Sequence, residues 1–252
     1  MTQKLIKLKK DYYVYLDIKA RRIAGKLSNG NKVTKLLLND INELYSSAKA
    51  DSSFKNEKFE AAYHNPISSE LEFLIARLLY HYANSKKLDW KIYLRRQVGK
   101  TAPDIRIEKN NITLAIIEVK AKAGWIQSFF SSERYKKDMD KLKSGKSNSD
   151  PRQSIEKVKK QLEKYYQTYN IKPKQVFVLL PSFTQVHRKR SSLEIKDYDN
   201  EFFKNSGLPK KNLILLSDNL SLDLSSNHYR KDYNPTNRFE DFISLLTQLD
   251  NK

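Results

Sequence analysis

The segment APDIRIEKNNITLAIIEVK, residues 102–120, constrains the fold more than any other part of the chain. Two apolar stretches rich in β-branched residues flank the turn-forming cluster Lys-Asn-Asn at 109–111, which predicts a β-hairpin. The alternating stretch WKIYLRRQV, at 90–98, predicts one more strand just before it. The chain is therefore expected to contain a sheet that begins with three consecutive strands.

Helical and strand patterns alternate around this hairpin, which is typical of the α/β class. Helical spacing of apolar residues occurs before and after the hairpin and near the C-terminus, and two short, almost wholly apolar runs read as strands buried on both faces. The expected helices are 66–85, 150–169 and 237–249, with a further helix at 33–45, and the expected buried strands are 174–182 and 212–218. The residues at 141–153 and 183–192 are expected to form loops.

Charged residues end the second strand of the hairpin. Because side chains alternate along a strand, Ile112, Leu114, Ile116, Glu118 and Lys120 are expected to share one face. A carboxylate that follows apolar positions is costly to bury unless it is paired or bound to a metal. Glu118 and Lys120 could simply neutralise each other as an ion pair at the strand end, and that alternative stays open.

The loop length decides whether a second carboxylate joins them. If Lys-Asn-Asn is a three-residue loop, Glu108 pairs with Ile112 and Asp104 pairs with Ile116. Asp104 then shares the face of Glu118, diagonally about 7–8 Å away. A two-residue loop would turn Asp104 to the other face, so the expectation is conditional on the count.

Two converging carboxylates supply the hard oxygen ligands that suit Mg²⁺. Beside such a metal, the ammonium of Lys120 could orient or help deprotonate a water and stabilise negative charge at phosphorus. Pro103 and Asp104, then thirteen residues, then Glu118, Val119 and Lys120 resemble the signature of the PD-(D/E)xK nucleases, the restriction-endonuclease-like superfamily.

The resemblance implies a restriction-endonuclease-like core, with a central mixed β-sheet flanked by helices. It would occupy residues 61–252, with basic insertions, after a helical N-terminal segment at 1–60. The resemblance also implies that Asp104, Glu118 and the carbonyl of Val119 bind Mg²⁺, for which Mn²⁺ is expected to substitute. Lys120 would assist the nucleophilic water.

Several branches of this superfamily add a carboxylate from the preceding helix. Recombination- and repair-type branches carry a Gln, followed four residues later by a Tyr, after the Glu-x-Lys strand. Glu70 and Glu72 are the two candidates for the carboxylate, and Glu70 is favoured. Stabilisation of the first helical turn is the alternative role for either. Gln161 and Tyr165 have the four-residue spacing that places them on one helix face, and Gln153 is a weaker second candidate.

The net charge points to a polyanionic partner. The chain has 48 Lys and Arg against 29 Asp and Glu, a net charge of +19. Such a field attracts nucleic acid, with a membrane surface as the rival partner and a general lysine-rich composition as the neutral explanation.

Several basic residues lie near the predicted site or in separate clusters, where they could contact phosphates or form a solvated surface. The predicted nucleic-acid contacts are Arg95, Arg96, Lys122, Arg188, Lys189 and Arg190. The aromatic residues Trp125, Phe129 and Phe130 follow closely, and they could stack on bases or pack in the core.

Other classes of site find little support. The chain has no Cys, which suits a reducing cytoplasm, and no paired His motif for zinc. Neither a transmembrane run nor a signal peptide is expected, and SGKS at 144–147 lacks the spacing of a nucleotide-triphosphate loop. We therefore expect a cytoplasmic protein with no membrane partner.

These observations predict a Mg²⁺-dependent endonuclease that hydrolyses DNA phosphodiester bonds, first as a homodimeric type II restriction enzyme. A repair, recombination or CRISPR-associated nuclease of the same superfamily, acting on single-stranded DNA or RNA, is the alternative. A non-catalytic nucleic-acid-binding protein, with structural charges at 104, 118 and 120, is the third reading.

Overall fold

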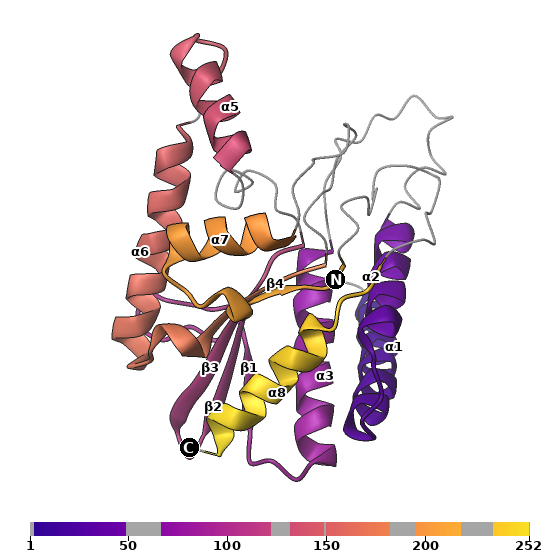
Figure 1. The fold of residues 1–252 in the computed structure, drawn as a ribbon. Helices are drawn as coiled ribbons and strands as arrows, with labels where there is room; N and C mark the ends of the chain where they lie inside the picture. The colour runs from indigo at the N-terminus through magenta and orange to yellow at the C-terminus, as the bar shows by residue number, and fades with distance from the viewer. Residues whose placement is uncertain are drawn as a thin grey trace, which may run out of the picture.

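A five-stranded mixed sheet forms the centre of the molecule (Figure 1). The structure is a computed structural model that describes residues 3–48, 67–121, 132–148, 150–181, 195–217 and 234–251. The strands follow the chain in space: β1 Lys91–Leu94, β2 Ile105–Lys109, β3 Ile112–Val119, β4 Val176–Leu180 and β5 Leu213–Leu215. The first three strands pair antiparallel and the last three pair parallel. The predicted α/β class with a mixed sheet is confirmed.

Helices surround this sheet, and two of them were not expected. The helices are α1 Gln3–Ser28, α2 Thr34–Ala48, α3 Ser68–Ser85, α5 Ser132–Lys143, α6 Pro151–Tyr169, α7 Ile195–Ser206 and α8 Arg238–Asp250. The sequence reading missed α5 and α7. The helix α7 connects β4 to β5, a parallel pair, and such a pair needs a long crossover connection. Within the described ranges, none of the helices is long and apolar enough to span a membrane.

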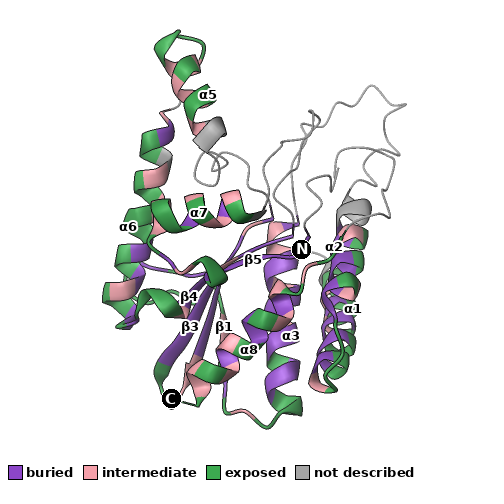
Figure 2. Ribbon diagram, in the orientation of Figure 1, coloured by how far each residue is buried: buried purple, intermediate pink, exposed green. Residues whose placement is uncertain are grey.

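The helices form two layers with the sheet between them (Figures 1 and 2). The larger core joins buried residues of α1, α2, α3 and α8 to one face of the sheet. The smaller core joins buried residues of α6 and α7 to the other face. Both predicted buried strands supply both cores: Val176, Leu180, Leu213 and Leu215 enter the smaller core, and Phe177, Leu179 and Ile214 enter the larger one.

The helix α6 is stabilised at both ends by its own sequence. Asp150 is the N-cap residue and accepts a hydrogen bond from the backbone N–H of Arg152 at 2.9 Å. Pro151 opens the first turn, and Asn170 ends the helix in the left-handed conformation at φ 50°. These signals set the axial position of α6, and therefore which of its residues reach the end of β3.

The turn of the β2–β3 hairpin has two residues, so the expected three-residue loop is wrong. Lys109 pairs with Ile112, and the turn residues Asn110 and Asn111 have φ values of 51° and 62°. Positive φ at both central positions is the geometry of a type I′ turn, which matches the twist of a two-stranded ribbon and which Asn tolerates.

A β-bulge restores the face that the shorter loop would have lost. The register shifts between Ile107 and Glu108, so that Leu114 is an extra residue on β3. Arg106 consequently pairs with Ile116 and Ile105 with Ile117, and one further residue in this register puts Asp104 opposite Glu118.

The bulge also changes the expected sharing of faces along β3. Leu114 packs in the larger core, whereas Ile116 packs in the smaller one. Ile112 is 71% exposed at the turn. The continuous apolar face expected from 112 to 116 is therefore wrong, because the extra residue interrupts the alternation.

The N-terminal helices share the larger core with the rest of the fold. Buried residues of α1 and α2 belong to the same cluster as those of α3 and α8. Glu240 of α8 accepts hydrogen bonds from the backbone N–H groups of Val33 and Thr34 at 2.6 and 2.9 Å, at the start of α2. Asp17 of α1 contacts both Arg77 and His81 of α3.

The hairpin turn provides a stability test. Replacing Asn111 by Val is expected to destabilise the protein by about 1–2 kcal/mol, because a β-branched residue is strained at positive φ. Asn111→Gly should be neutral or stabilising, since Gly adopts this conformation freely. Urea denaturation of the two variants measures the difference, and equal stabilities would contradict the type I′ assignment.

Candidate active site

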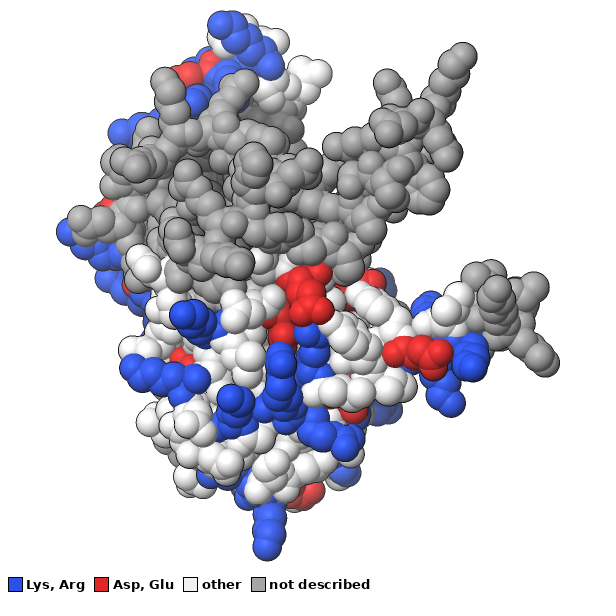
Figure 3. Space-filling view, turned by 90° about the vertical axis from the view of Figure 1, so that its right-hand side faces the viewer, with Lys and Arg blue, Asp and Glu red and all other residues white. Residues whose placement is uncertain are grey.

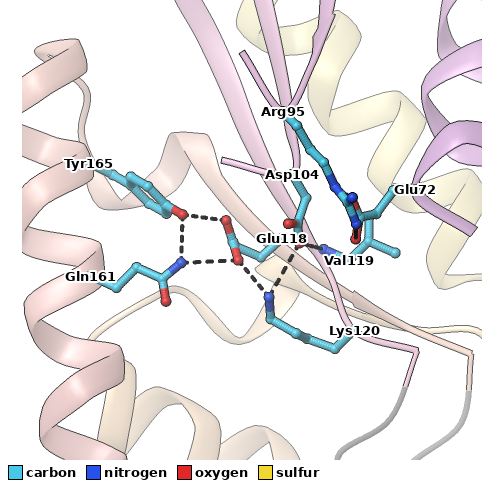
Figure 4. A network of polar contacts seen from close by, with 8 residues as sticks. All are labelled: Glu72, Arg95, Asp104, Glu118, Val119, Lys120, Gln161 and Tyr165. Atoms are coloured by element: carbon cyan, nitrogen blue, oxygen red, sulfur yellow. Dashed lines mark hydrogen bonds and ion pairs between the residues drawn. The ribbon is translucent and has the colours of Figure 1, made fainter. Parts of the chain in front are cut away.

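Three charged side chains from the β2–β3 hairpin converge at the C-terminal end of β3 (Figure 4). Asp104 directly precedes β2, Glu118 is the penultimate residue of β3, and Lys120 directly follows that strand. The ammonium nitrogen Nζ of Lys120 lies 2.7 Å from Oε2 of Glu118 and 3.3 Å from Oδ2 of Asp104. The backbone N–H of Val119 donates to the same Asp104 oxygen at 2.9 Å.

The electrostatics of this cluster favour cations. Burial, and then the negative charge of Glu118, raise the pKa of Asp104 to about 7, although Lys120 acts in the opposite direction. Burial opposes the charge on Lys120, but Glu118 and Asp104 outweigh it and raise the lysine pKa above its ordinary value. Lys120 is therefore a fixed cation in this arrangement and is poorly suited to accept a proton.

The helix α6 holds Glu118 from the other side. The hydroxyl of Tyr165 donates to Oε1 of Glu118 at 2.5 Å, and Nε2 of Gln161 donates to Oε2 at 3.2 Å. Gln161 also donates to the Tyr165 hydroxyl at 2.6 Å. Burial and the charge of Glu118 raise the pKa of Tyr165, so that the phenol stays neutral and remains a donor. Together with Lys120, these donors orient both oxygens of Glu118.

A third carboxylate reaches the site from α3, and it is Glu72 rather than the favoured Glu70. Glu72 is 4% exposed and is bound by the guanidinium of Arg95, whose Nη2 lies 2.8 Å from Oε1. The charge of Glu72 is a smaller contribution to the raised pKa of Asp104, after burial and Glu118. The backbone N–H of Arg95 also donates to the carbonyl of Asp104 at 3.0 Å.

Glu70 faces α1 instead. After burial, its charge is the next cause that raises the pKa of Tyr12 to about 12. One Glu70 carboxylate oxygen is buried without a hydrogen-bond partner among the described residues. Sequence position could not separate Glu70 from Glu72, because both lie near the start of α3 and the rotation of the helix is set by packing.

Two of the six predicted nucleic-acid contacts, Arg95 and Arg96, lie within the described residues. Arg95 is half exposed and paired with Glu72, and Arg96 lies over the ring of Tyr93 at 4.7 Å from its centroid. Lys122, Arg188, Lys189 and Arg190 lie outside the described residues, as do Trp125, Phe129 and Phe130. Gln153 lies in the first turn of α6, about two turns before Gln161.

The sequence reading missed a pocket that adjoins the cluster. The pocket measures about 330 Å³ and lies between the turn at 98–101 and α6. Its lining residues are Lys100, Thr101, Ala102, Lys157, Lys160, Gln161, Lys164 and Tyr165. The signal in the sequence is the recurrence of Lys at helical spacing around Gln161.

The donor set suits Mg²⁺. Mg²⁺ is held in proteins through one or two carboxylates, with waters and substrate phosphates completing its coordination. Asp104 and Glu118 supply two such carboxylates on one side of the site, and both bond to the same cation, Lys120. No group of three or more His, Cys, Asp or Glu side chains in metal-binding arrangement occurs among the residues that the structure describes.

The raised pKa of Asp104 predicts a pH-dependent stability difference. The folded protein binds this proton up to about pH 7, whereas the ordinary value is 3.8. The stability that the group contributes is therefore complete below about pH 3.8 and is lost as the pH rises to about 7. Asp104→Asn, which cannot titrate, should gain about 1 kcal/mol or more over wild type at pH 8, or about 2–4 °C in Tm.

Thermal melts in EDTA between pH 4.5 and 8 measure this gap, which should widen with pH. Asp89→Asn is the matched control, because Asp89 is an exposed residue outside the cluster. A gap that stays constant across the range, or a less stable Asp104→Asn variant at pH 8, would contradict the assignment.

Comparison with known proteins adds no relative. Neither a protein-family model, nor a curated protein, nor a solved structure matches this chain. The function is therefore argued from the geometry of the site.

Proposed function

We propose that the protein is a Mg²⁺-dependent endonuclease that hydrolyses DNA phosphodiester bonds, with a sequence-specific type II restriction enzyme as the first candidate. The observation that supports this proposal most directly is the ammonium of Lys120 bound to the carboxylates of both Asp104 and Glu118. The residue types and their order on a hairpin are those of the PD-(D/E)xK signature.

Asp104 and Glu118, with the carbonyl of Val119, would hold the Mg²⁺, and Mn²⁺ should substitute. When bound, the ion would supply Lewis acidity toward the phosphoryl oxygen and lower the pKa of a coordinated water. Glu118 is already oriented for this role by Tyr165 and Gln161, and oriented ligands bind metals more tightly than mobile ones.

Lys120 would orient the attacking water and stabilise the negative charge that develops on the phosphoryl oxygens. Its raised pKa suits this electrostatic role better than that of a general base. In the hydrolysis, the water oxygen bonds to phosphorus and one bridging P–O bond breaks. The leaving oxygen takes a proton, so that water is consumed and two ends are released.

A second candidate is a repair, recombination or CRISPR-associated nuclease that acts on single-stranded DNA or RNA. The contacts of Gln161 and Tyr165 with Glu118 favour it, because the Gln and Tyr pair resembles the recombination and repair branches of the superfamily. A third reading, binding without catalysis, would leave the Lys120 ion pairs with a purely structural role.

A plasmid digest with Mg²⁺ separates these readings. We expect cleavage that EDTA abolishes; discrete bands indicate a restriction enzyme, and a smear indicates a nonspecific nuclease. If the protein binds duplex DNA, single-stranded DNA or RNA but cleaves none of them with Mg²⁺ or Mn²⁺, the non-catalytic reading is favoured. Sedimentation with and without DNA tests the proposed homodimer.

Asp104→Ala and Lys120→Ala should each reduce the cleavage rate by about 10³-fold or more, because each removes a charge that acts on the reacting centre. Both variants should retain salt-sensitive DNA binding. Lys211→Ala, at an exposed position in the short 3-10 helix Lys210–Asn212, is the control and should cleave at the wild-type rate. Wild-type rates in both site variants would refute the site assignment.

Tyr165→Phe tests the contact from α6. The loss of one hydroxyl should lower cleavage or Mg²⁺ affinity by about 10- to 100-fold, since Glu118 loses an orienting donor. Tyr166→Phe is the matched control on the next residue of the same helix, and it should have little effect. Similar rates in the two variants would mean that the Tyr165 hydroxyl has no part in the reaction.

A further inference from the structure

We propose that the lysine-lined pocket beside the cluster binds the phosphodiester backbone of the substrate strand next to the bond that is cleaved. This inference rests on the proposed function, because it assumes that a nucleic acid reaches the site. It assigns the contact to Lys100, Lys157, Lys160 and Lys164, which line the pocket.

The pocket lies between two walls that are connected by hydrogen bonds. One wall is the turn at 98–101, in which Gly99 has φ 57° and the backbone N–H groups of Val98 and Thr101 donate to each other's carbonyls at 2.9 and 3.1 Å. The other wall is α6. The hydroxyls of Thr101 and Tyr169 lie 3.1 Å apart, and Tyr169 also bonds to the Thr101 carbonyl at 3.2 Å. The turn that presents Lys100 is thus fastened to the helix.

The lysines on α6 form a row suited to an extended polyanion. Lys157, Lys160 and Lys164 lie at positions i, i+3 and i+7, which share one helix face. At a rise of 1.5 Å per residue, the row spans about 10 Å. Phosphates of one strand advance by about 3.4 Å along the duplex axis. The row is therefore long enough for about three phosphates, which favours an internal stretch of backbone over a single anion.

These ammonium groups are largely available for a ligand. Within the described parts of the chain, an ion pair in this row joins Nζ of Lys160 to Glu156 at 3.9 Å, and both side chains are exposed. An exposed pair of this kind contributes little and exchanges readily with another anion.

The pocket lies beside the candidate active site and shares two residues with it. Gln161 and Tyr165 line the pocket, and both also bond to Glu118. A backbone bound along the lysine row would therefore pass the side chains that orient Glu118. Lys and Arg are also spread over the side of the molecule that carries α1 and α2 (Figure 3), so charge alone does not locate the substrate.

The test compares two variants of equal charge. Lys157→Gln, Lys160→Gln and Lys164→Gln are combined in the pocket variant. Lys159→Gln, Lys174→Gln and Lys211→Gln are combined in the control variant. Lys159 lies about 160° around α6 from Lys157, and the other two lie in short 3-10 helices. Anisotropy with a labelled 20-base-pair duplex in EDTA gives Kd at several salt concentrations.

The pocket variant is expected to bind at least tenfold more weakly and to lose about 2–3 from the slope of log Kd against log salt, about 0.9 for each lost phosphate contact. The control variant should change the slope by less than about 0.5. Equal changes in the two variants, or an unchanged pocket variant, would overturn the proposal. If the triple variant unfolds in circular dichroism, Lys100→Gln with Lys164→Gln replaces it, with an expected loss of about 1–2 from the slope.

Two additional comparisons distinguish an internal backbone contact from an end contact, and binding from cleavage. Duplexes with and without a 5′-phosphate should bind alike; pocket dependence seen only with the 5′-phosphate would refute an internal backbone contact. Because binding is measured without Mg²⁺, the proposed function can fail separately. If binding depends on the pocket lysines but no cleavage occurs, the pocket assignment stands and the proposed nuclease activity is refuted. If cleavage occurs but binding does not depend on these lysines, the nuclease activity stands and the pocket assignment is refuted.

Discussion

The register between β2 and β3 is the constraint on which the site depends. A two-residue Asn-Asn turn would by itself put Asp104 and Glu118 on opposite faces of the sheet, and the bulge at Leu114 returns them to the same face. The two carboxylates are then held close enough to share Lys120. Two buried carboxylates that are close enough to contact one ammonium group repel each other when both are charged. A cation beside them is therefore stabilising.

The helix α6 connects the core, the carboxylates and the basic pocket. One of its faces packs Leu162, Tyr165 and Tyr169 into the smaller core. The hydroxyl of Tyr165 extends from that packed face to Glu118, and the lysines beside it reach the surface. A single helix thus sets the position of Glu118 relative to the row of lysines.

Arg95 makes two separate contacts in the part of the site around Glu72. Arg95 follows β1 directly, and its side chain binds Glu72 while its backbone N–H binds the Asp104 carbonyl. The guanidinium neutralises Glu72, and its half-exposed position leaves one side open to solvent. The arginine that the sequence suggested as a phosphate contact is thus first an internal partner of the site.

Local patterns in the sequence determined most of the elements of this protein. Apolar periodicity predicted α2, α3, α6, α8 and the strands, because helix and strand geometry relate residues close in the chain. The resemblance to the PD-(D/E)xK signature singled out Asp104, Glu118, Lys120, Gln161 and Tyr165, and the fold does bring these side chains together. The helix α5 was missed because its sequence is strongly polar.

Only the tertiary structure decided the loop length, the bulge, the choice of Glu72 over Glu70 and the joining of the 98–101 turn to α6. Each depends on how one element is rotated or offset against another, which is set by packing across the two cores. A shift of one residue in a strand, or about 100° in a helix, changes which side chain faces the site while leaving the local pattern unchanged.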